Sequence, residues 1–201
     1  MTTVEQRPSA GYELARKAMV DSQLRTSGVN AEFVLQRMGV VAREDFVPSI
    51  ARGIAYIDRA IALDGGRQLA APVVQGRMLQ EAAPNKADRA LLVDGGSGYL
   101  AELLRPLVQT LDVVSPEQAL AADTPTGDYS LVLIDGAVEQ LPAALAARIA
   151  DSGRIVTGLV INRITSVAIG RKSGATISLL PVIEMGIPVL AEFNLPKGWS
   201  F

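Results

Sequence analysis

The chain has neither cysteine nor histidine among its 201 residues. These absences exclude disulfides, thiolate chemistry and any imidazole base or imidazole metal ligand, so zinc enzymes and Ser-His-Asp hydrolases are not expected. We therefore predict no metal site. The 19 basic and 21 acidic residues leave a formal net charge of -2, and this balance gives no basic excess for nucleic acid or an anionic membrane surface.

Long hydrophobic runs are also missing. The apolar stretch at residues 155–169 is interrupted by Arg163 and is too short to cross a bilayer. Residues 1–8 are polar and lack the apolar segment of a signal peptide. We expect a cytoplasmic protein that binds no membrane. The 49% hydrophobic content indicates a folded core, and the chain length suits a single compact unit.

Residues 1–80 are expected to form a helical N-terminal subdomain packed on the rest of the chain. Apolar residues recur at helical spacing in residues 12–24, and Asn30 is placed to cap a second helix. The glycine pair at 65–66 marks a loop, and Pro72 suits the first turn of a third helix.

Residues 81–201 alternate between strand and helix patterns. The expected strands are 90–93, 111–114, 129–134 and 154–160, followed by a hairpin of 167–171 and 175–180. The expected helices run through Leu100–Leu107 and from Pro142 through Ile149, with a stop at 151–153, and a short crossover over 116–122 can connect two of the strands. Uninterrupted apolar strands are typical of a parallel sheet covered on both faces. The pattern predicts an α/β fold whose sheet is mostly parallel and ends in an antiparallel hairpin.

The segment Ala90 to Tyr99 passes from an apolar strand through a glycine cluster into a helical pattern. Glycines let the backbone turn tightly and approach a ligand, and the free N–H groups of the next helix can meet a negative group. The cluster is therefore either a cofactor loop or only a tight strand-to-helix turn. Asp135 follows another strand, where open α/β sheets bind ligands; its alternative role is to form a turn before Gly136.

Several segments taken together resemble the protein-L-isoaspartate O-methyltransferases, class I methyltransferases that use S-adenosylmethionine (SAM). They are residues 19–25, 43–48, 55–59, 94–99, 134–142 and 153–156, in the order that this family shows. The resemblance covers nearly the whole chain. It implies a Rossmann-like methyltransferase domain over 81–201, SAM as cofactor, and an isoaspartyl protein or peptide as methyl acceptor.

The resemblance also implies site residues. Cofactor contacts fall on Asp94, Gly95, Gly96, Gly98, Ser115 and Asp135, and acceptor contacts on Gln68, Leu69, Ala70, Ala71 and Pro72. The family reaction transfers the methyl group of SAM to a carboxylate. Because that carboxylate is already ionised at neutral pH, the reaction needs alignment more than a strong base, and it tolerates the absence of histidine and cysteine.

The glycine loop departs from the family pattern Glu/Asp-x-Gly-x-Gly-x-Gly, because Leu92 takes the acidic place and Asp94 the first glycine place. A left-handed backbone at Asp94 would cost about 1–2 kcal/mol. Its carboxylate would be repelled by roughly 3 kcal/mol if it lay about 5 Å from the carboxylate of SAM. Beside the ammonium of SAM it would help binding, and it can also cap the helix that begins near Gly98.

A third departure follows the strand at 111–114. Ser115 stands where this class has an acidic residue for the ribose hydroxyls, and Glu117 is a candidate substitute. Only 13 residues, 116–128, separate Ser115 from Tyr129, whereas a βαβ unit takes about 30 or more. The sheet is thus expected to be shortened by one β-α unit. Strand 111–114 then becomes an edge that can pair with a second copy or a protein partner.

The fourth departure lies in the acceptor segment, where residues 66–72 align with the family's Gly-Gln-Thr-Ile-Ser-Gln/Ala-Pro. Arg67 stands at the place of its glutamine, and Ala70 replaces the serine that contacts the acceptor carboxylate in the family. No catalytic residue is assigned, and Arg67 and Arg77 are interpreted as solvated surface charges. The first hypothesis is an isoaspartyl methyltransferase with eroded cofactor and acceptor sites. The alternative is a catalytically inactive protein that acts as a binding or scaffolding subunit, favoured if side chains fill the cleft beyond Asp94. A third option is another nucleotide or an acidic metabolite in that cleft.

Overall fold

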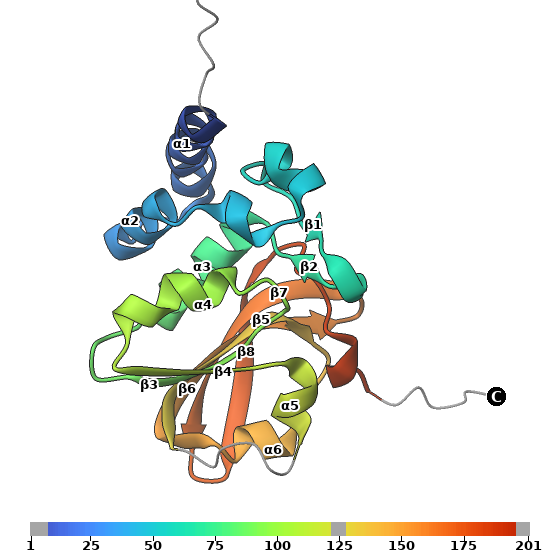
Figure 1. Ribbon diagram of the computed structural model, residues 1–201. Coiled ribbons are helices and arrows are strands. Elements are labelled where there is room, and N and C mark those ends of the chain that lie inside the picture. Colours follow the sequence, from blue (N-terminus) through green and yellow to red (C-terminus); the bar gives the residue numbers. More distant parts are fainter. Residues whose placement is uncertain (1–7, 122–127, 196–201) are drawn as a thin grey trace, which may run out of the picture.

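The computed structural model describes residues 8–121 and 128–195, which form a six-stranded sheet flanked by helices (Figure 1). The strand order is β4-β3-β5-β6-β7-β8. The strands are β3 (Arg89–Val93), β4 (Thr110–Val114), β5 (Tyr129–Val138), β6 (Ile149–Ile161), β7 (Ile164–Ser173) and β8 (Thr176–Glu184). Strands β3 to β6 pair in parallel, whereas β7 pairs antiparallel with both neighbours. The expected α/β sheet with an antiparallel C-terminal hairpin is confirmed.

Helices cover both faces of this sheet, with α3 and α4 on one side and α5 and α6 on the other (Figure 1). The α-helices are α1 (Pro8–Met19), α2 (Glu32–Val40), α3 (Pro72–Ala82), α4 (Tyr99–Leu104), α5 (Pro116–Leu120) and α6 (Ala143–Ala146). Shorter turns are η1 (Val20–Leu24), η2 (Arg25–Ser27), η3 (Arg43–Phe46), η4 (Ser49–Ile54), η5 (Asp64–Gly66), η6 (Arg105–Leu107) and η7 (Ala191–Phe193). A small antiparallel pair, β1 (Ile61–Ala62) and β2 (Gln68–Leu69), interrupts the expected helical region. No helix in the described ranges is long and apolar enough to cross a membrane.

Strands β3 and β5 contain uninterrupted runs of apolar residues because both faces of each strand are buried. Leu92 and Leu133 belong to the core cluster beneath α3 and α4, whereas Leu91 and Val132 belong to the cluster beneath α5 and α6. All four side chains are fully buried. Successive side chains of a strand point to opposite faces, so each strand contributes to both clusters.

Strand β4 is an edge of the described sheet, as expected, since it pairs only with β3. Its Asp112 accepts a hydrogen bond of 2.7 Å from the Tyr129 hydroxyl of β5. In the described part of the connection to β5, α5 is the one helix, and the end of the expected crossover at residue 122 lies outside the described residues.

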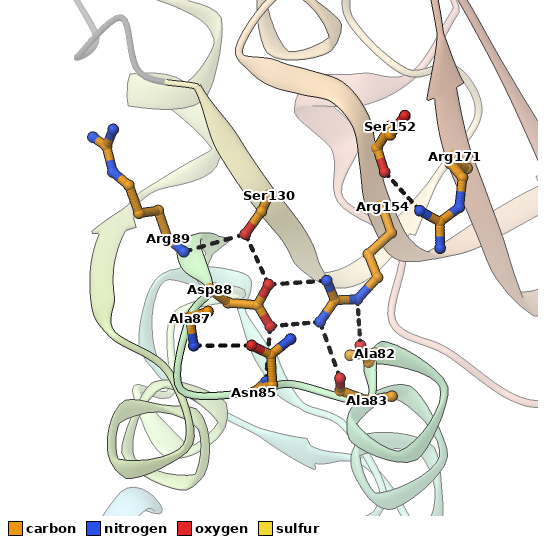
Figure 2. A network of polar contacts seen from close by, with 10 residues as sticks. All are labelled: Ala82, Ala83, Asn85, Ala87, Asp88, Arg89, Ser130, Ser152, Arg154 and Arg171. Atoms are coloured by element: carbon orange, nitrogen blue, oxygen red, sulfur yellow. Dashed lines mark hydrogen bonds and ion pairs between the residues drawn. The ribbon is translucent and has the colours of Figure 1, made fainter.

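A partly buried ion pair lies near the amino ends of β3 and β5 (Figure 2). The Asp88 carboxylate binds the Arg154 guanidinium at 2.9 and 2.6 Å and accepts from the Ser130 hydroxyl at 2.8 Å. Burial opposes ionisation of Asp88, but these hydrogen bonds outweigh it and hold the pKa of Asp88 below its ordinary value. Arg154 also donates to the carbonyls of Ala82 and Ala83, where α3 ends. The network thereby ties α3 to the sheet.

Two local expectations are wrong. Asn30 does not cap α2 with its side chain; the Gln80 amide oxygen accepts from the backbone N–H groups of Asn30 and Ala31 at 2.8 and 3.0 Å. The helix after Pro142 ends at Ala146, and Ile149 begins β6 because it pairs with Tyr129. In both places a contact with a residue distant in the sequence determines the structure, and the local sequence pattern does not.

Candidate cofactor and acceptor cleft

A cavity of about 270 Å³ lies beyond the carboxyl ends of β3 and β4. It is bounded by the segment before β2, the glycine loop, the start of α5 and the C-terminal segment that includes η7. The lining residues are Gly65, Gly66, Arg67, Gln68, Gly95, Glu117, Pro188, Val189, Leu190, Ala191 and Glu192. In Figure 1 these segments meet at the right-hand end of the sheet.

The Asp94 carboxylate turns into the glycine loop. It accepts hydrogen bonds of 3.0 Å from the backbone N–H groups of Gly96 and Gly98. Gly98 is the residue before α4, with φ +74°, whereas Asp94 is not among the residues with positive φ. Asp94 therefore bonds two N–H groups of the loop before α4 and none of the first turn of the helix, and the left-handed strain considered for Asp94 is absent. Burial raises the pKa of Asp94, although both hydrogen bonds oppose the shift.

The loop glycines differ in what they face. A Cβ on Gly95 would lie 2.3 Å from the carbonyl oxygen of Asp135, so the close approach of β5 requires glycine there. A Cβ on Gly96, whose φ is +108°, would lie 2.9 Å from Cγ of Arg67. Gly95 thus serves the fold, whereas Gly96 is covered by a flexible side chain.

Arg67 forms ion pairs across the cleft and is not the solvated charge that we expected. Its guanidinium binds Glu117 at 2.5 Å and Glu192 at 2.9 and 3.2 Å. The hydrogen bond to Glu192 raises the pKa of Arg67. Arg77 is likewise engaged, because it donates to the Gly28 carbonyl at 2.8 Å. Neither arginine carried a sequence signal for these contacts, except that Arg67 stands where the family motif has glutamine.

Ser115 and Glu117 lie together after β4. The Ser115 hydroxyl donates to the Glu117 carboxylate at 2.7 Å and accepts from the backbone N–H of Gln118 at 3.2 Å. The first of these bonds lowers the pKa of Glu117. Ser115 is therefore the N-cap of α5, within a complete capping box. Glu117 is the acidic group of this pair that borders the cavity.

Asp135 lies inside β5 and does not form a turn, so the turn interpretation is wrong. Asp135 is 5% exposed, and its carboxylate accepts hydrogen bonds from the Gln75 amide at 3.0 and 3.3 Å. Gln75 in turn accepts from the guanidinium of Arg43 at 2.6 Å. Burial, together with the negative charge of Asp94, raises the pKa of Asp135 to about 7. The backbone carbonyl of Asp135 packs against Gly95 of the glycine loop, and Asp135 is not among the residues that line the cavity.

The acceptor segment is held by its backbone. The fully buried Arg43 guanidinium donates to the carbonyls of Ala55 and Ala70, and Asp58 accepts from the N–H of Val73 at the start of α3. Of the five expected acceptor residues, only Gln68 borders the cavity. The remaining four, which are Leu69, Ala70, Ala71 and Pro72, are buried.

Comparisons with known proteins identify the family of this chain. The family model described as "Protein-L-isoaspartate(D-aspartate) O-methyltransferase (PCMT)" matches residues 15–121. A protein-L-isoaspartate O-methyltransferase from Koribacter versatilis is 31% identical over 170 residues, covering 73% of this chain and 77% of that protein. One from Aeropyrum pernix is 45% identical over 103 residues, covering 51% of this chain and 39% of that protein.

The fold also matches a crystal structure. That structure, described as "a putative protein-L-isoaspartate O-methyltransferase" from Plasmodium falciparum in complex with S-adenosyl-L-homocysteine, has a TM-score of 0.72 and 14% identity over 90% of this chain and 98% of that one. At this identity the likeness concerns the fold alone. With the family match over more than half of the sequence, the conclusion is that the chain belongs to the protein-L-isoaspartate O-methyltransferase family.

Proposed function

We propose that this chain is a SAM-dependent methyltransferase that methylates isoaspartyl carboxylates of proteins or peptides. Family membership supports the reaction class, and the Plasmodium relative contains the demethylated form of SAM. The observation that carries the proposal is the shared cavity. It brings Gly95 of the glycine loop, Glu117 after β4 and Gln68 of the acceptor segment to one place.

The residues around the cavity suit a nucleoside cofactor once Arg67 moves. Glu117 is 59% exposed and, with Ser115, offers oxygen acceptors for ribose hydroxyls. The cavity of about 270 Å³ is slightly smaller than ligand sites of about 300–1,000 Å³, and the Arg67 stem over Gly96 accounts for part of the lost space. Partly exposed ion pairs contribute about 0–1 kcal/mol each, whereas micromolar binding supplies about 8 kcal/mol. Breaking the ion pairs of Arg67 therefore costs much less free energy than cofactor binding supplies.

The chain must hold the methyl donor and the acceptor carboxylate in alignment. Bound SAM would bring an electrophilic methyl group, and the acceptor carboxylate is ionised at neutral pH. The chain's own residues would bind both partners and exclude water. Neither task requires histidine or cysteine.

A second function is favoured by Ala70, which is 2% exposed and lacks the hydroxyl of the family motif. The ion pairs of Arg67 also place side chains in the cleft, the arrangement that the scaffold hypothesis requires. In this case the chain would be a non-catalytic subunit, and edge strand β4 would be its binding surface.

Methyl transfer separates the two functions. The chain would be incubated with radiolabelled SAM and either of two peptides of one sequence, carrying isoaspartate or ordinary aspartate. We expect methyl transfer only to the isoaspartyl peptide. The rate of transfer should be lower in Glu117→Gln and unchanged in Glu13→Gln. Glu13 is an exposed residue of α1 outside the cleft, so it matches the charge change. No transfer by a folded chain would favour the non-catalytic subunit.

A further inference from the structure

Arg67 and Glu192 form a bidentate pair inside the cavity. Two guanidinium nitrogens of Arg67 contact the two carboxylate oxygens of Glu192, at 2.9 and 3.2 Å. The planar fork of arginine matches a carboxylate in this geometry, which gives both strength and orientation. The structure thus contains an arginine that already binds a carboxylate in the way an external carboxylate would be bound.

Glu192 is presented by an anchored turn. It lies in η7, between Leu190 and Phe193, which are 4% and 1% exposed and pack in the core cluster beneath α5 and α6. The side chain of Glu192 is itself 22% exposed. The backbone of η7 is therefore held in place by buried side chains, while the carboxylate of Glu192 is accessible to solvent.

Arg67 stands between the two groups that the reaction must join. Its stem packs against Gly96 of the cofactor loop, and its backbone directly precedes Gln68 of the acceptor segment. Among the residues that line the cavity, Arg67 is the one cation. Ala70, in the same segment, provides no hydroxyl donor.

We propose that Arg67 holds the acceptor carboxylate, and that Glu192 occupies this position as an internal stand-in until the substrate displaces it. The proposal rests on the proposed function in one respect, namely that the acceptor is a carboxylate. A carboxylate has about four lone-pair sites, so bidentate binding leaves each oxygen able to attack. The oxygen–methyl bond then forms as the sulfur–methyl bond of SAM breaks, giving a methyl ester and a neutral thioether.

Binding measured without cofactor tests this assignment. The full chain would be titrated calorimetrically with a short isoaspartyl peptide whose termini are blocked, so that its one carboxylate is that of the isoaspartyl residue. Glu192→Gln removes the competing charge and is expected to bind the peptide about tenfold more tightly than the unmodified chain. Glu13→Gln makes the same charge change outside the cleft and should leave the affinity unchanged.

Arg67 is tested with Arg67→Gln, which installs the residue of the family motif. This variant is expected to bind the peptide about tenfold more weakly, and adding Glu192→Gln to it should then give no gain. A peptide with a carboxamide in place of the carboxylate should bind all variants equally weakly. Thermal unfolding of each variant verifies that differences in affinity do not come from loss of fold.

Three outcomes would overturn the assignment. They are equal peptide affinity in Glu192→Gln and Glu13→Gln, undiminished affinity in Arg67→Gln, and no binding by Glu192→Gln at millimolar peptide. Methyl transfer that persists in Arg67→Gln would leave the proposed function standing without this role for Arg67. Peptide binding that follows Arg67 and Glu192 in a chain that does not bind SAM would retain this role and contradict the methyltransferase.

Discussion

Both oxygens of the Asp94 carboxylate accept a hydrogen bond from the backbone N–H of Gly98, at 3.0 and 3.2 Å. The same carboxylate accepts from Gly96. Asp94, at the first glycine place of the family pattern, therefore accepts hydrogen bonds from the backbone N–H groups of the loop itself. A ligand group that carries negative charge must compete with it, whereas the ammonium and sulfonium of SAM are not repelled.

Replacing Asp94 tests its structural role. Asp94→Ala removes the acceptor for two loop N–H groups and is expected to lower the free energy of unfolding by about 1–2 kcal/mol. Asp94→Asn keeps an oxygen acceptor and should lose less than half of that amount. Urea denaturation followed by circular dichroism measures both. Equal stability of Asp94→Ala and the unmodified chain would mean that the hydrogen bonds from the loop N–H groups to Asp94 contribute nothing to stability.

The raised pKa of Asp135 predicts a pH dependence of stability. The pKa of Asp135 is about 3.9 in the unfolded chain and about 7 in the folded chain. At pH values between these two, Asp135 holds a proton in the folded chain that it has released in the unfolded chain. Rising pH therefore disfavours the folded state across this window. Asp135→Asn does not titrate, so its stability relative to the unmodified chain should rise by about 2–4 kcal/mol from pH 4 to pH 8. Parallel stability curves for the two chains over this range would refute the burial argument.

The ion pair of Asp88 and Arg154 should stabilise the fold without affecting the cleft. Asp88→Ala leaves a partly buried guanidinium without its carboxylate and is expected to cost about 2–4 kcal/mol. Arg171→Ala, which removes an exposed hydrogen bond to the Ser152 carbonyl, is the control and should cost about 0.5 kcal/mol or less. Chemical denaturation gives both values. At a temperature where the variants remain folded, peptide affinity should not change; a change would show coupling between the two ends of the sheet.

Restoring the family serine tests the acceptor site. In Ala70→Ser a hydroxyl donor returns to the segment that Arg43 holds, and we expect methyl transfer to the isoaspartyl peptide to increase about tenfold. Ala71→Ser places the same group one residue away and serves as the control. If both variants transfer at the same rate as the unmodified chain, the loss of the serine is not what limits this enzyme.

The sheet was predictable because its signals are local. The uninterrupted apolar run before Asp94 and the run that begins at Tyr129 indicated strands buried on two faces, and the short distance from Ser115 to Tyr129 predicted that β4 would be an edge. The buried strands follow from composition and spacing alone, whereas the edge position of β4 also required the resemblance to the family, whose sheet has one more β-α unit. The hairpin of β7 and β8 was found in the same way, with strands longer than expected.

The errors arose where distant contacts decide the outcome. Gln80 replaces the side chain of Asn30 at the start of α2 across 50 positions of the sequence, and Arg67 meets Glu192 across 125. No periodicity in the sequence encodes such pairs, because they exist only once the sheet has brought the segments together. The loop glycines were recognised, but the reason for Gly95 lies in the Asp135 carbonyl and could not be read from spacing.

The proposed methyltransferase function requires that the cleft closed by Arg67 binds SAM. Calorimetric titration of the folded chain with SAM, at low and at high salt, tests it most directly. We expect saturable binding at one site, with a dissociation constant between about 1 µM and 1 mM, because opening the ion pairs of Arg67 reduces the affinity. Absence of binding at millimolar SAM, in a chain whose cooperative thermal unfolding shows that it is folded, would contradict it.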